Sequence, residues 1–554
     1  MPSFYMDKLN GATEQEDLFY VGDLFIRAVS QAKLAICVGI KMKKISFLLL
    51  VQLIALILIA CGDSSNKQKE GSALVYGSGD YTRINPAIDE HGEINILLFD
   101  GLTAHDGNNQ VVPGLAKSWS FDEATCTYTF FLEEGVNWHD GKPFTAEDVK
   151  FTIEAIMNPE NGSENAPNFE DVEEITVIDD TTITFQLAAP NVAFLDYMTM
   201  SVLPRHLLEG EDMQTSEFFR NPVGTGPYRL ESWEEGQAII LAKNEEYFKT
   251  PARIDRIIFK IVSDDSAKAL QLKSGELDLA LLPPKLAKGF DAEEGYTRYQ
   301  MKTADYRGIM FNFQNAYWQE NRDIIPAICY GLDRQAIVDA VLLGQGVAAY
   351  GPLQRNPYHH EAVEHYDYNP QKAGEILETA GCTLGEDGFY YRNGEKIGFT
   401  ISVAAGDQAR VDIAQAAAQQ LKEVGIDVST EIPPRVDWEK QMAYLIGWGS
   451  PFDADDHTYK VFGSGKGANY SGYSNAQVDR YLIEARQTDD PKVRAEAYAA
   501  FQKALAEDPA FAFICYIDAD YVAISGLQGI SPDTTLGHHG VGIFWNITEW
   551  TLEK

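Results

Sequence analysis

The sequence predicts a mixed α/β (α+β) protein, because segments with the periodicity of a strand alternate with segments with the periodicity of a helix. Thr127–Leu132 and residues 181–187 alternate apolar and polar side chains with the period of two that is typical of half-buried strands. Between them, residues 145–148 have the pattern of a capping box, and Val149 and Ile156 would share one face of the following helix. These segments indicate strands and helices that pack in layers.

The same alternation continues into the second half of the chain. Buried strands are indicated by short apolar runs, and helices by apolar stripes between a capping residue and a glycine. We predict strands over residues 256–262 and 307–313, a helix from Asn369-Pro370 to Gly381, a helix over residues 410–424 and a strand over residues 426–432.

A basic cluster and an apolar run lie near the N-terminus. Lysines within residues 41–44 precede the mostly apolar residues 45–60, which are few for a membrane span of roughly 20 residues. The segment that ends Leu-Ile-Ala-Cys61 resembles a bacterial lipobox, which implies cleavage before Cys61 and acylation of its thiol. Residues 42–60 would be the lipoprotein signal peptide, and residues 61–73 the lipidated cysteine and a flexible tether. The alternative is a short transmembrane anchor.

Residues 1–41 fit no secretory signal, because acids such as Glu14 and Asp17 precede the basic cluster. We expect this stretch to be a non-native extension caused by a start codon assigned too early, with Met42 as the true first residue. The mature protein would then lie on the extracytoplasmic face of a bacterial cell membrane, held there by its lipid.

The composition excludes several kinds of partner and site. The net charge of -37 gives a negative field that repels nucleic acid and anionic membrane surfaces. The cysteines after the lipobox form no C-x-x-C pair, which argues against a zinc cluster or a redox motif and leaves disulfide pairing open. They are Cys126, Cys329, Cys382 and Cys515.

No catalytic motif is present in the sequence. There is no G-x-S-x-G elbow, and residues 463–468 are not a phosphate loop because Lys466 lacks a following Ser or Thr. We therefore expect neither an enzyme nor a resident cofactor. A purely adhesive or chaperone-like surface lipoprotein is a further alternative, which would bind no small ligand saturably.

Short segments spread over the mature chain occur in an order that is typical of one family. They are Gly101-Leu102 with residues 113–119, residues 137–149, residues 222–228, residues 273–278, residues 368–373 and residues 473–479. In these segments the chain resembles the extracytoplasmic solute-binding proteins of ABC importers for peptides, nickel complexes and related solutes. The resemblance implies a receptor that delivers its solute to ABC permease subunits, and we expect it to act as a monomer.

The resemblance also implies a fold of two lobes joined by a hinge, which closes around the solute. The first lobe would combine residues 74–304 with residues 513–554 and would contain an inserted subdomain at about residues 100–220. The second lobe would be residues 305–512. In this fold the solute is enclosed where the lobes meet.

Residues 447–457 have the composition of a ligand loop, because Trp448 offers a flat apolar wall and an acid can hold a cation. In peptide-binding members, an Asp three residues after the Trp pairs with the peptide's α-amino group. Here Pro451 stands at that place, and the first acid is Asp453. The arrangement is more similar to that of nickel-chelate-binding members, in which the Trp and a nearby aromatic residue line the pocket. In this chain, Phe452 would take the place of that aromatic residue.

The arginines give a conflicting indication. Two arginines of the nickel members would fall near residues 158–167 and near Met200, and neither place has one. Arg410 instead lies close to where dipeptide-binding members keep an Arg for the C-terminal carboxylate, which a guanidinium binds bidentately. The alternative for Arg410 is a solvated residue in the first turn of a helix. We predict short peptides as the solute, with a nickel chelate as the alternative.

Residues after two strands are further candidates for contact with solute. Tyr76, Asp80 and Tyr81 stand at the end of the first strand, where glycines permit close approach. Asn312 is a candidate on the strand that ends near residue 313, although a structural amide is the alternative.

Two histidine pairs could ligate nickel under the alternative, because imidazole suits this metal. His359-His360 lies in a stretch that matches neither H-E-x-x-H nor H-x-x-E-H. His538-His539 lies near the C-terminus, and its alternative is a polar surface turn between Gly537 and Gly540. A metal at either pair would favour nickel over peptide.

Overall fold

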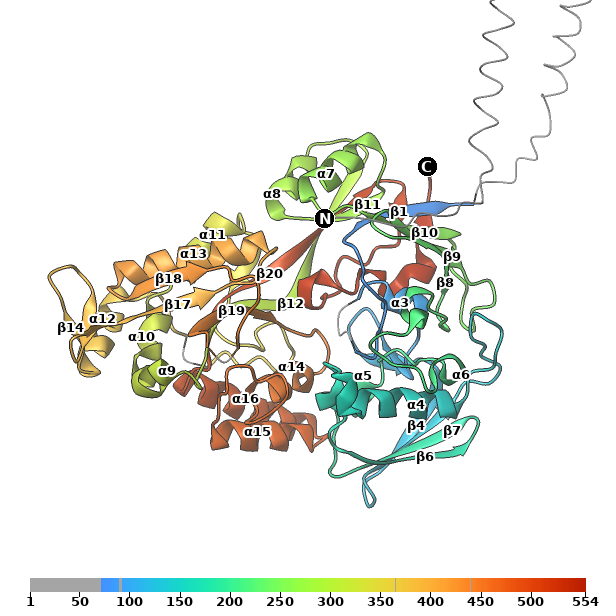
Figure 1. Ribbon diagram of the computed structural model, residues 1–554, viewed down its shortest axis with the longest axis horizontal. Coiled ribbons are helices and arrows are strands. Elements are labelled where there is room, and N and C mark those ends of the chain that lie inside the picture. The colour runs from blue at the N-terminus through green and yellow to red at the C-terminus, as the bar shows by residue number, and fades with distance from the viewer. Residues whose placement is uncertain (1–70, 89–91, 364, 439) are drawn as a thin grey trace, which may run out of the picture. The chain divides into compact units, whose positions relative to one another are not determined.

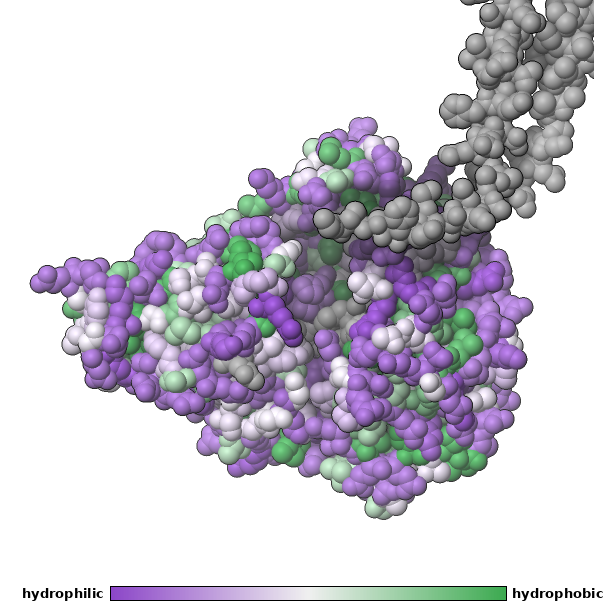
Figure 2. Space-filling model, viewed as in Figure 1, coloured by the Kyte–Doolittle hydropathy of each residue, from purple (hydrophilic) through white to green (hydrophobic). Residues whose placement is uncertain are grey.

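The computed structural model describes residues 71–88, 92–363, 365–438 and 440–554, which belong to one compact unit. The expected N-terminal extension, the signal peptide, Cys61 and most of the tether lie outside the described residues. Within the described ranges, no helix is both long and apolar enough to cross a membrane. Hydrophilic side chains dominate the face in Figure 2, as expected for a chain of net charge -37.

A large mixed sheet runs through this unit (Figure 1). In spatial order its strands are β18 (Asp427–Glu431), β17 (Gly398–Ser402), β19 (Ala443–Trp448), β12 (Tyr296–Phe311), β20 (Phe511–Ile524), β11 (Leu279–Leu282), β1 (Ala73–Ser78), β10 (Arg256–Ile261), β9 (Ala238–Lys243) and β8 (Tyr228–Glu234). β1 is parallel to both of its neighbours, whereas β12 and β20 form a long antiparallel pair. The short β13 (Gly346–Ala348) adds to β20.

An inserted subdomain carries its own antiparallel sheet of β4 (Ala116–Asp122), β5 (Thr127–Leu132), β7 (Thr182–Leu187) and β6 (Val172–Asp179). The hairpin of β2 (Thr103–His105) and β3 (Val111–Pro113) precedes this sheet. The helices of the subdomain are α4 (Ala146–Met157), α5 (Phe194–Tyr197) and α6 (Arg205–Leu208). Alternate residues such as Phe130 and Ile183 are buried, which gives the sheet one apolar face for the helices to cover.

The remaining elements surround the large sheet. Between β12 and β20 lie α9 (Ala316–Asn321), α10 (Ile325–Tyr330), α11 (Arg334–Val341), α12 (Pro370–Thr379), α13 (Gln408–Glu423), α14 (Ala454–Phe462), α15 (Ala476–Arg486) and α16 (Pro491–Glu507), with the small sheet of β14 (Thr383–Leu384), β15 (Tyr390–Arg392) and β16 (Glu395–Lys396). Elsewhere lie α3 (Asn95–Leu98), α7 (Asp265–Ser274), α8 (Pro284–Ala287) and the pair β21 (Leu527–Gln528) and β22 (Thr551–Leu552).

Buried apolar side chains divide the unit into two lobes. The main cluster of the first lobe draws on residues 74–301 and 519–550. The clusters of the second lobe draw on residues 306–516. Because each lobe has its own core, the lobes can rotate as rigid bodies about the strands that join them. The cysteines are unpaired within the described residues, and all but Cys126 are buried.

β12 and β20 carry the chain from one lobe to the other. Their pairing is irregular over residues 302–306, where Thr303 pairs with Leu536 instead. Arg355 holds both strands at this point, since its Nη1 donates to the carbonyl oxygens of Thr303 (2.8 Å) and Ile517 (3.1 Å). We call this irregular stretch the hinge.

Most of the predicted elements occur where their patterns placed them. Thr145 and Asp148 form the reciprocal capping box at the start of α4, and Asn369 caps α12. α13 and β18 lie within two residues of their predicted ends. β12 is different, because it begins at Tyr296, far before residue 307. Its first half alternates polar and half-buried side chains and so lacks the apolar run that marks a buried strand.

Gly224 and Gly226 are not needed for a left-handed turn, because neither has a positive φ. A Cβ on Gly224 would lie 1.7 Å from the carbonyl oxygen of Leu98, and one on Gly226 would lie 2.5 Å from that of Leu97. These positions therefore need glycine because two backbones approach closely. His139 stabilises the corner, since its Nδ1 accepts a hydrogen bond from the Gly224 N–H (3.1 Å).

Candidate functional site

Five side chains meet beside the hinge, and we call them the hinge cluster: Asp305, Arg307, Arg410, His538 and His539. Asp305 lies within the irregular stretch of β12, and Arg307 directly follows it. Arg410 lies in the first turn of α13, and the two histidines lie in a short turn near the C-terminus. The cluster thus combines residues of both lobes.

Asp305, His538 and His539 bring three potential metal ligands together. His538 Nδ1 lies 2.8 Å from Asp305 Oδ1, and the His539 backbone N–H donates to Asp305 Oδ2 (3.0 Å). One ligand atom of each residue lies within 4.8 Å of the others. The φ of His539 is 56°, a left-handed conformation that brings the two consecutive rings to 3.9 Å between centroids. Two imidazoles and a carboxylate suit a divalent transition metal.

The surrounding groups keep Asp305 and His539 in metal-binding forms. Burial raises the pKa of the Asp305 carboxyl, but Arg307 and His538 outweigh burial and hold that pKa well below its usual range. Burial and the neighbouring His538 lower the pKa of His539 to about 3, so its imidazole is neutral at pH 7. Metal ions bind ionised carboxylates and neutral imidazoles.

Arg307 and Arg410 place two guanidinium groups over Gly447 of β19. A Cβ on Gly447 would lie 2.2 Å from Arg307 Nη1 and 2.7 Å from Arg410 Nη2. Arg307 donates a hydrogen bond to Asp305, whereas Arg410 Nε lies 3.3 Å from Asp407 Oδ2. Arg410 is only 7% exposed, yet its buried Nε has no hydrogen-bond partner among the described residues.

Arg410 has one carboxylate nearby, that of Asp407, but its buried Nε–H has no hydrogen-bond acceptor among the described residues. A buried donor without an acceptor is costly, so Arg410 favours a ligand that supplies acceptor atoms. The planar fork of a guanidinium matches a carboxylate. Asp305, His538 and His539 supply potential ligand atoms for a metal ion. Together with Arg410 they allow the hinge cluster to hold a small solute that carries both a carboxylate and a metal ion.

The residues predicted from the ligand loop are engaged elsewhere. Asp453 caps α14 and binds Arg494 through both carboxylate oxygens, at 2.6 Å each. Phe452 stacks on His105 of the first lobe, with ring centroids 3.7 Å apart and planes 6° from parallel. Trp448 directly follows Gly447 at the end of β19 and is half-buried. Of these three, Trp448 alone adjoins the hinge cluster.

The remaining predicted solute contacts, near the ends of β1 and β12, lie partly in the core and partly along an open cleft. Tyr76 is buried in the first-lobe core. Asp80 and Tyr81 line an open cleft of about 620 Å³ in the first lobe. Asn312 is fully buried, and its side-chain amide donates to the carbonyl oxygen of Gln441 (2.8 Å), which is the structural role of our alternative.

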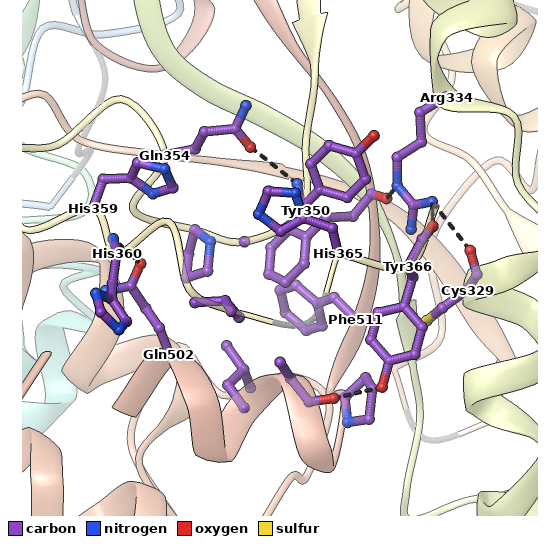
Figure 3. Close-up of a pocket in the computed structure, with 17 residues that line it drawn as sticks. Cys329, Arg334, Tyr350, Gln354, His359, His360, His365, Tyr366, Gln502 and Phe511 are labelled. Atoms are coloured by element: carbon purple, nitrogen blue, oxygen red, sulfur yellow. Dashed lines mark hydrogen bonds between the residues drawn. The ribbon is translucent and has the colours of Figure 1, made fainter. Parts of the chain in front are cut away.

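The other histidine pair lies inside the second lobe. His359 and His360 line a cavity of about 30 Å³ together with the buried Arg334 (Figure 3). Such a volume admits a water molecule but not a solute. Arg334 Nη1 donates to the Tyr366 carbonyl oxygen (2.6 Å), one of several backbone oxygens that satisfy this arginine. Among the described residues, only the hinge cluster brings three metal-ligand atoms together.

Two members of the hinge cluster were missed at the level of sequence. Asp305 and Arg307 stand at alternate positions of a strand that is otherwise buried and apolar from Ala304 to Phe311. Alternate positions point to one face of the sheet, so the two charges lie on the same face. Opposite charges in a buried strand need partners or a function, and this signal could have identified them.

The sequence and the fold agree with those of known proteins. Residues 110–470 match the family described as bacterial extracellular solute-binding proteins, family 5, middle. The chain belongs to this family. Protein XP55 of Streptomyces lividans is 34% identical, over 81% of this chain and 84% of that protein.

Two solved structures of similar proteins cover almost all of the described chain. NikZ from Campylobacter jejuni, in complex with Ni(L-His), has 36% identity and a TM-score of 0.80, covering 87% of this chain and 99% of that one. AppA from Bacillus subtilis, in complex with a nonapeptide, has 28% identity and a TM-score of 0.76, covering the same shares of both chains, 87% and 99%.

The family confirms the main expectation from the sequence. This family 5 chain is an extracytoplasmic solute-binding protein that works with an ABC importer and is not an enzyme. Its fold is the two-lobed fold of the family.

Proposed function

We propose that this family 5 receptor captures a small chelate of a divalent transition metal, with nickel bound to an amino acid such as histidine as the leading case. The observation that carries the proposal is the hinge cluster. There, two imidazoles and a carboxylate converge within 4.8 Å, and the buried Nε of Arg410 in the same cluster has no hydrogen-bond acceptor among the described residues. A permease of the ABC type would receive the solute when the lobes open.

The two parts of the cluster would divide the solute between them. His538, His539 and Asp305 would hold the metal ion, and Arg410 would bind the carboxylate of the chelating amino acid. Arg307 would keep Asp305 ionised and in place. A chelate thus accounts for the carboxylate-binding arginine and the histidine pair, which pointed to different solutes in the sequence. The similarity to NikZ, whose structure holds Ni(L-His), supports the same solute.

Short peptides are the second candidate, and they were our first expectation from the sequence. Arg410 would then bind the C-terminal carboxylate of the peptide. AppA from Bacillus subtilis, a relative in complex with a nonapeptide, supports this reading. A peptide leaves the three potential metal ligands His538, His539 and Asp305 without a role, so we place it second.

We also propose that the mature chain is held on the membrane by lipid on Cys61. The support is the lipobox-like sequence that ends at Cys61 and the polar stretch after it. Cys61→Ser should release the protein from the membrane fraction of cells and abolish its labelling with a radioactive fatty acid. Labelling that persists in this variant would contradict the anchor.

Calorimetric titration of the purified protein tests the solute. We expect Ni²⁺ with L-histidine to bind one per chain, and a mixture of short peptides to give no saturable heat. The double substitution His538→Ala and His539→Ala should weaken nickel–histidine binding at least 100-fold, because it removes two of three metal ligands. Arg410→Gln should weaken it by about tenfold or more, because a charged hydrogen bond is lost.

The other histidine pair supplies a matched control. His359→Ala with His360→Ala changes the same residue types in the second-lobe cavity and should leave the affinity unchanged. Peptides retained one per chain, with no heat from nickel and histidine, would overturn the chelate and favour the second candidate.

A further inference from the structure

The inserted subdomain meets the second lobe along a polar contact that we call the seam. It consists of Glu170, Asp171 and Tyr197 from the first lobe and Asp455, Lys466 and Arg486 from the second. In Figure 1, α5 of the subdomain lies beside α14, well below the crossing of β12 and β20. The seam therefore joins the lobes at a place remote from the hinge.

Arg486 at the end of α15 is the centre of the seam. Its Nη2 lies 3.1 Å from Asp455 Oδ2 within its own lobe, and its Nη1 lies 3.1 Å from Asp171 Oδ2 of the other lobe. The side chain is only 4% exposed. Its backbone also takes part, since the Val192 N–H of the subdomain donates to the Arg486 carbonyl oxygen (3.0 Å).

Two further pairs cross the same boundary. The Tyr197 hydroxyl donates to Asp455 Oδ2 (2.5 Å), and the Asp455 side chain is fully buried. Lys466 Nζ lies 2.7 Å from Glu170 Oε1. When the lobes separate, Tyr197 and Asp171 leave Asp455 and Arg486, and water must replace them. These contacts involve no solute, and removal of one partner would leave the opposite charge buried and unpaired in the closed state.

We propose that the seam is a latch, centred on Arg486, that sets the population of the closed receptor and thereby the strength with which it retains any solute. The hinge cluster recognises the solute, whereas the seam stabilises the closed arrangement of the lobes. This role is independent of the identity of the solute, because none of the seam residues belongs to the hinge cluster.

The seam offers a site for a disulfide that reports closure. A Cβ on Gly467 would lie 3.5 Å from the Cβ of Pro167 across the boundary, which is the separation of a disulfide. The purified protein with Pro167→Cys and Gly467→Cys would cross-link only while it is closed. Its rate of disulfide formation without solute measures how often the lobes close, even when closure is rare. Each single-cysteine variant gives the background rate.

Two latch variants and one control are compared in this double-cysteine protein. Arg486→Gln should slow cross-linking at least tenfold, because Asp455 and Asp171 lose their cation. Tyr197→Phe, which removes one hydroxyl, should slow it about threefold. Arg322→Gln breaks the pair with Asp508 (2.9 Å), which lies within the second lobe, and should change the rate less than twofold.

The outcome separates a latch from general stability. Equal cross-linking rates in Arg486→Gln and the parent would overturn the proposal, as would an equal loss in Arg322→Gln. Arg486→Lys, which keeps the charge, should recover part of the rate. Because the assay contains no metal or peptide, its result stands even when the proposed solute is wrong.

Discussion

The hinge cluster and the seam are both buried, charged contacts between the lobes, but they differ in which lobe supplies carboxylates to the arginine. In the seam, Arg486 lies 3.1 Å from a carboxylate oxygen of each lobe. In the hinge cluster, Arg410 pairs with Asp407 of its own lobe, at 3.3 Å. The comparison teaches that recognition and closure are separate here, since an arginine paired only within its lobe can bind the carboxylate of a solute, whereas one paired across the boundary favours closure.

We expect the largest effect from Glu93, which contacts the turn that carries His538 and His539. The effect is a change in how the stability of the protein depends on pH. Glu93 Oε1 accepts hydrogen bonds from the Gly542 N–H (3.1 Å) and the Tyr521 hydroxyl (3.2 Å). Burial raises the pKa of Glu93 from 4.5 to about 7. The folded protein therefore binds this proton more tightly than the unfolded chain. The resulting stabilisation is fully present below pH 4.5 and is lost as the pH rises through about 7.

Glu93→Gln should remove this loss, which amounts to about 3 kcal/mol. Melting temperatures of both proteins, measured by circular dichroism from pH 4 to pH 8, give the comparison. The wild type should fall relative to the variant across this range. A difference between the two proteins that is constant with pH would contradict the raised pKa.

Gly447→Ala should break the hinge cluster without touching the seam. Its Cβ would displace the guanidinium groups of Arg307 and Arg410, which lie 2.2 Å and 2.7 Å from that position. We expect about 100-fold weaker solute binding in calorimetry, because overpacking costs about 1–3 kcal/mol. Gly289→Ala, at a position with open space around its Cβ, should bind like the wild type. Equal affinity in Gly447→Ala would sink the assignment of this site.

Asp455→Asn should weaken the seam without touching the hinge cluster. The amide can still accept from Tyr197 but no longer neutralises Arg486, so we expect about tenfold weaker binding. The factor should be the same for nickel–histidine and cobalt–histidine, because the latch does not contact the solute. His539→Ala, by contrast, should weaken the binding of nickel–histidine and of cobalt–histidine by different factors, because His539 would contact the metal. Asp508→Asn, a change within one lobe, is the control.

Phe452→Leu should give the smallest effect. It removes the stack on His105 across the lobe boundary, where the ring centroids are 3.7 Å apart. A stacked pair contributes about 0.5–1.5 kcal/mol, so we expect about threefold weaker binding through faster dissociation. Tyr350→Leu breaks a similar stack with His365 inside the second lobe and should leave dissociation unchanged. Stopped-flow measurement of solute release distinguishes the two.

Much of the fold could be predicted from the sequence, because local patterns encode it. The capping box of Thr145 and the alternation in β5 and β7 depend only on neighbouring residues. The start of β12 could not be predicted in this way. Its first half is stabilised by pairing with β20, which is more than two hundred residues away in the chain.

The candidate site could be predicted only in part, because a pattern names residue types and not their partners. His538 and Arg410 were singled out for their chemistry, but nothing near His538 in the sequence indicates that Asp305 contacts it in space. Asp453 has the right chemistry for a ligand, yet Arg494 from a later helix binds both of its oxygens. Which acid pairs within the protein is decided by tertiary contacts.

The irregular pairing of β12 and β20 defines an axis about which the lobes rotate. The hinge cluster lies at this pivot, since Asp305 belongs to the irregular stretch, whereas the seam lies toward the other end of the lobe boundary (Figure 1). A given rotation displaces atoms in proportion to their distance from the axis. The groups that contact solute therefore move little, and the receptor can present a nearly complete site to solvent before it closes. The same rotation moves Arg486 over a much larger distance, so a small displacement at the hinge corresponds to a large displacement at the seam.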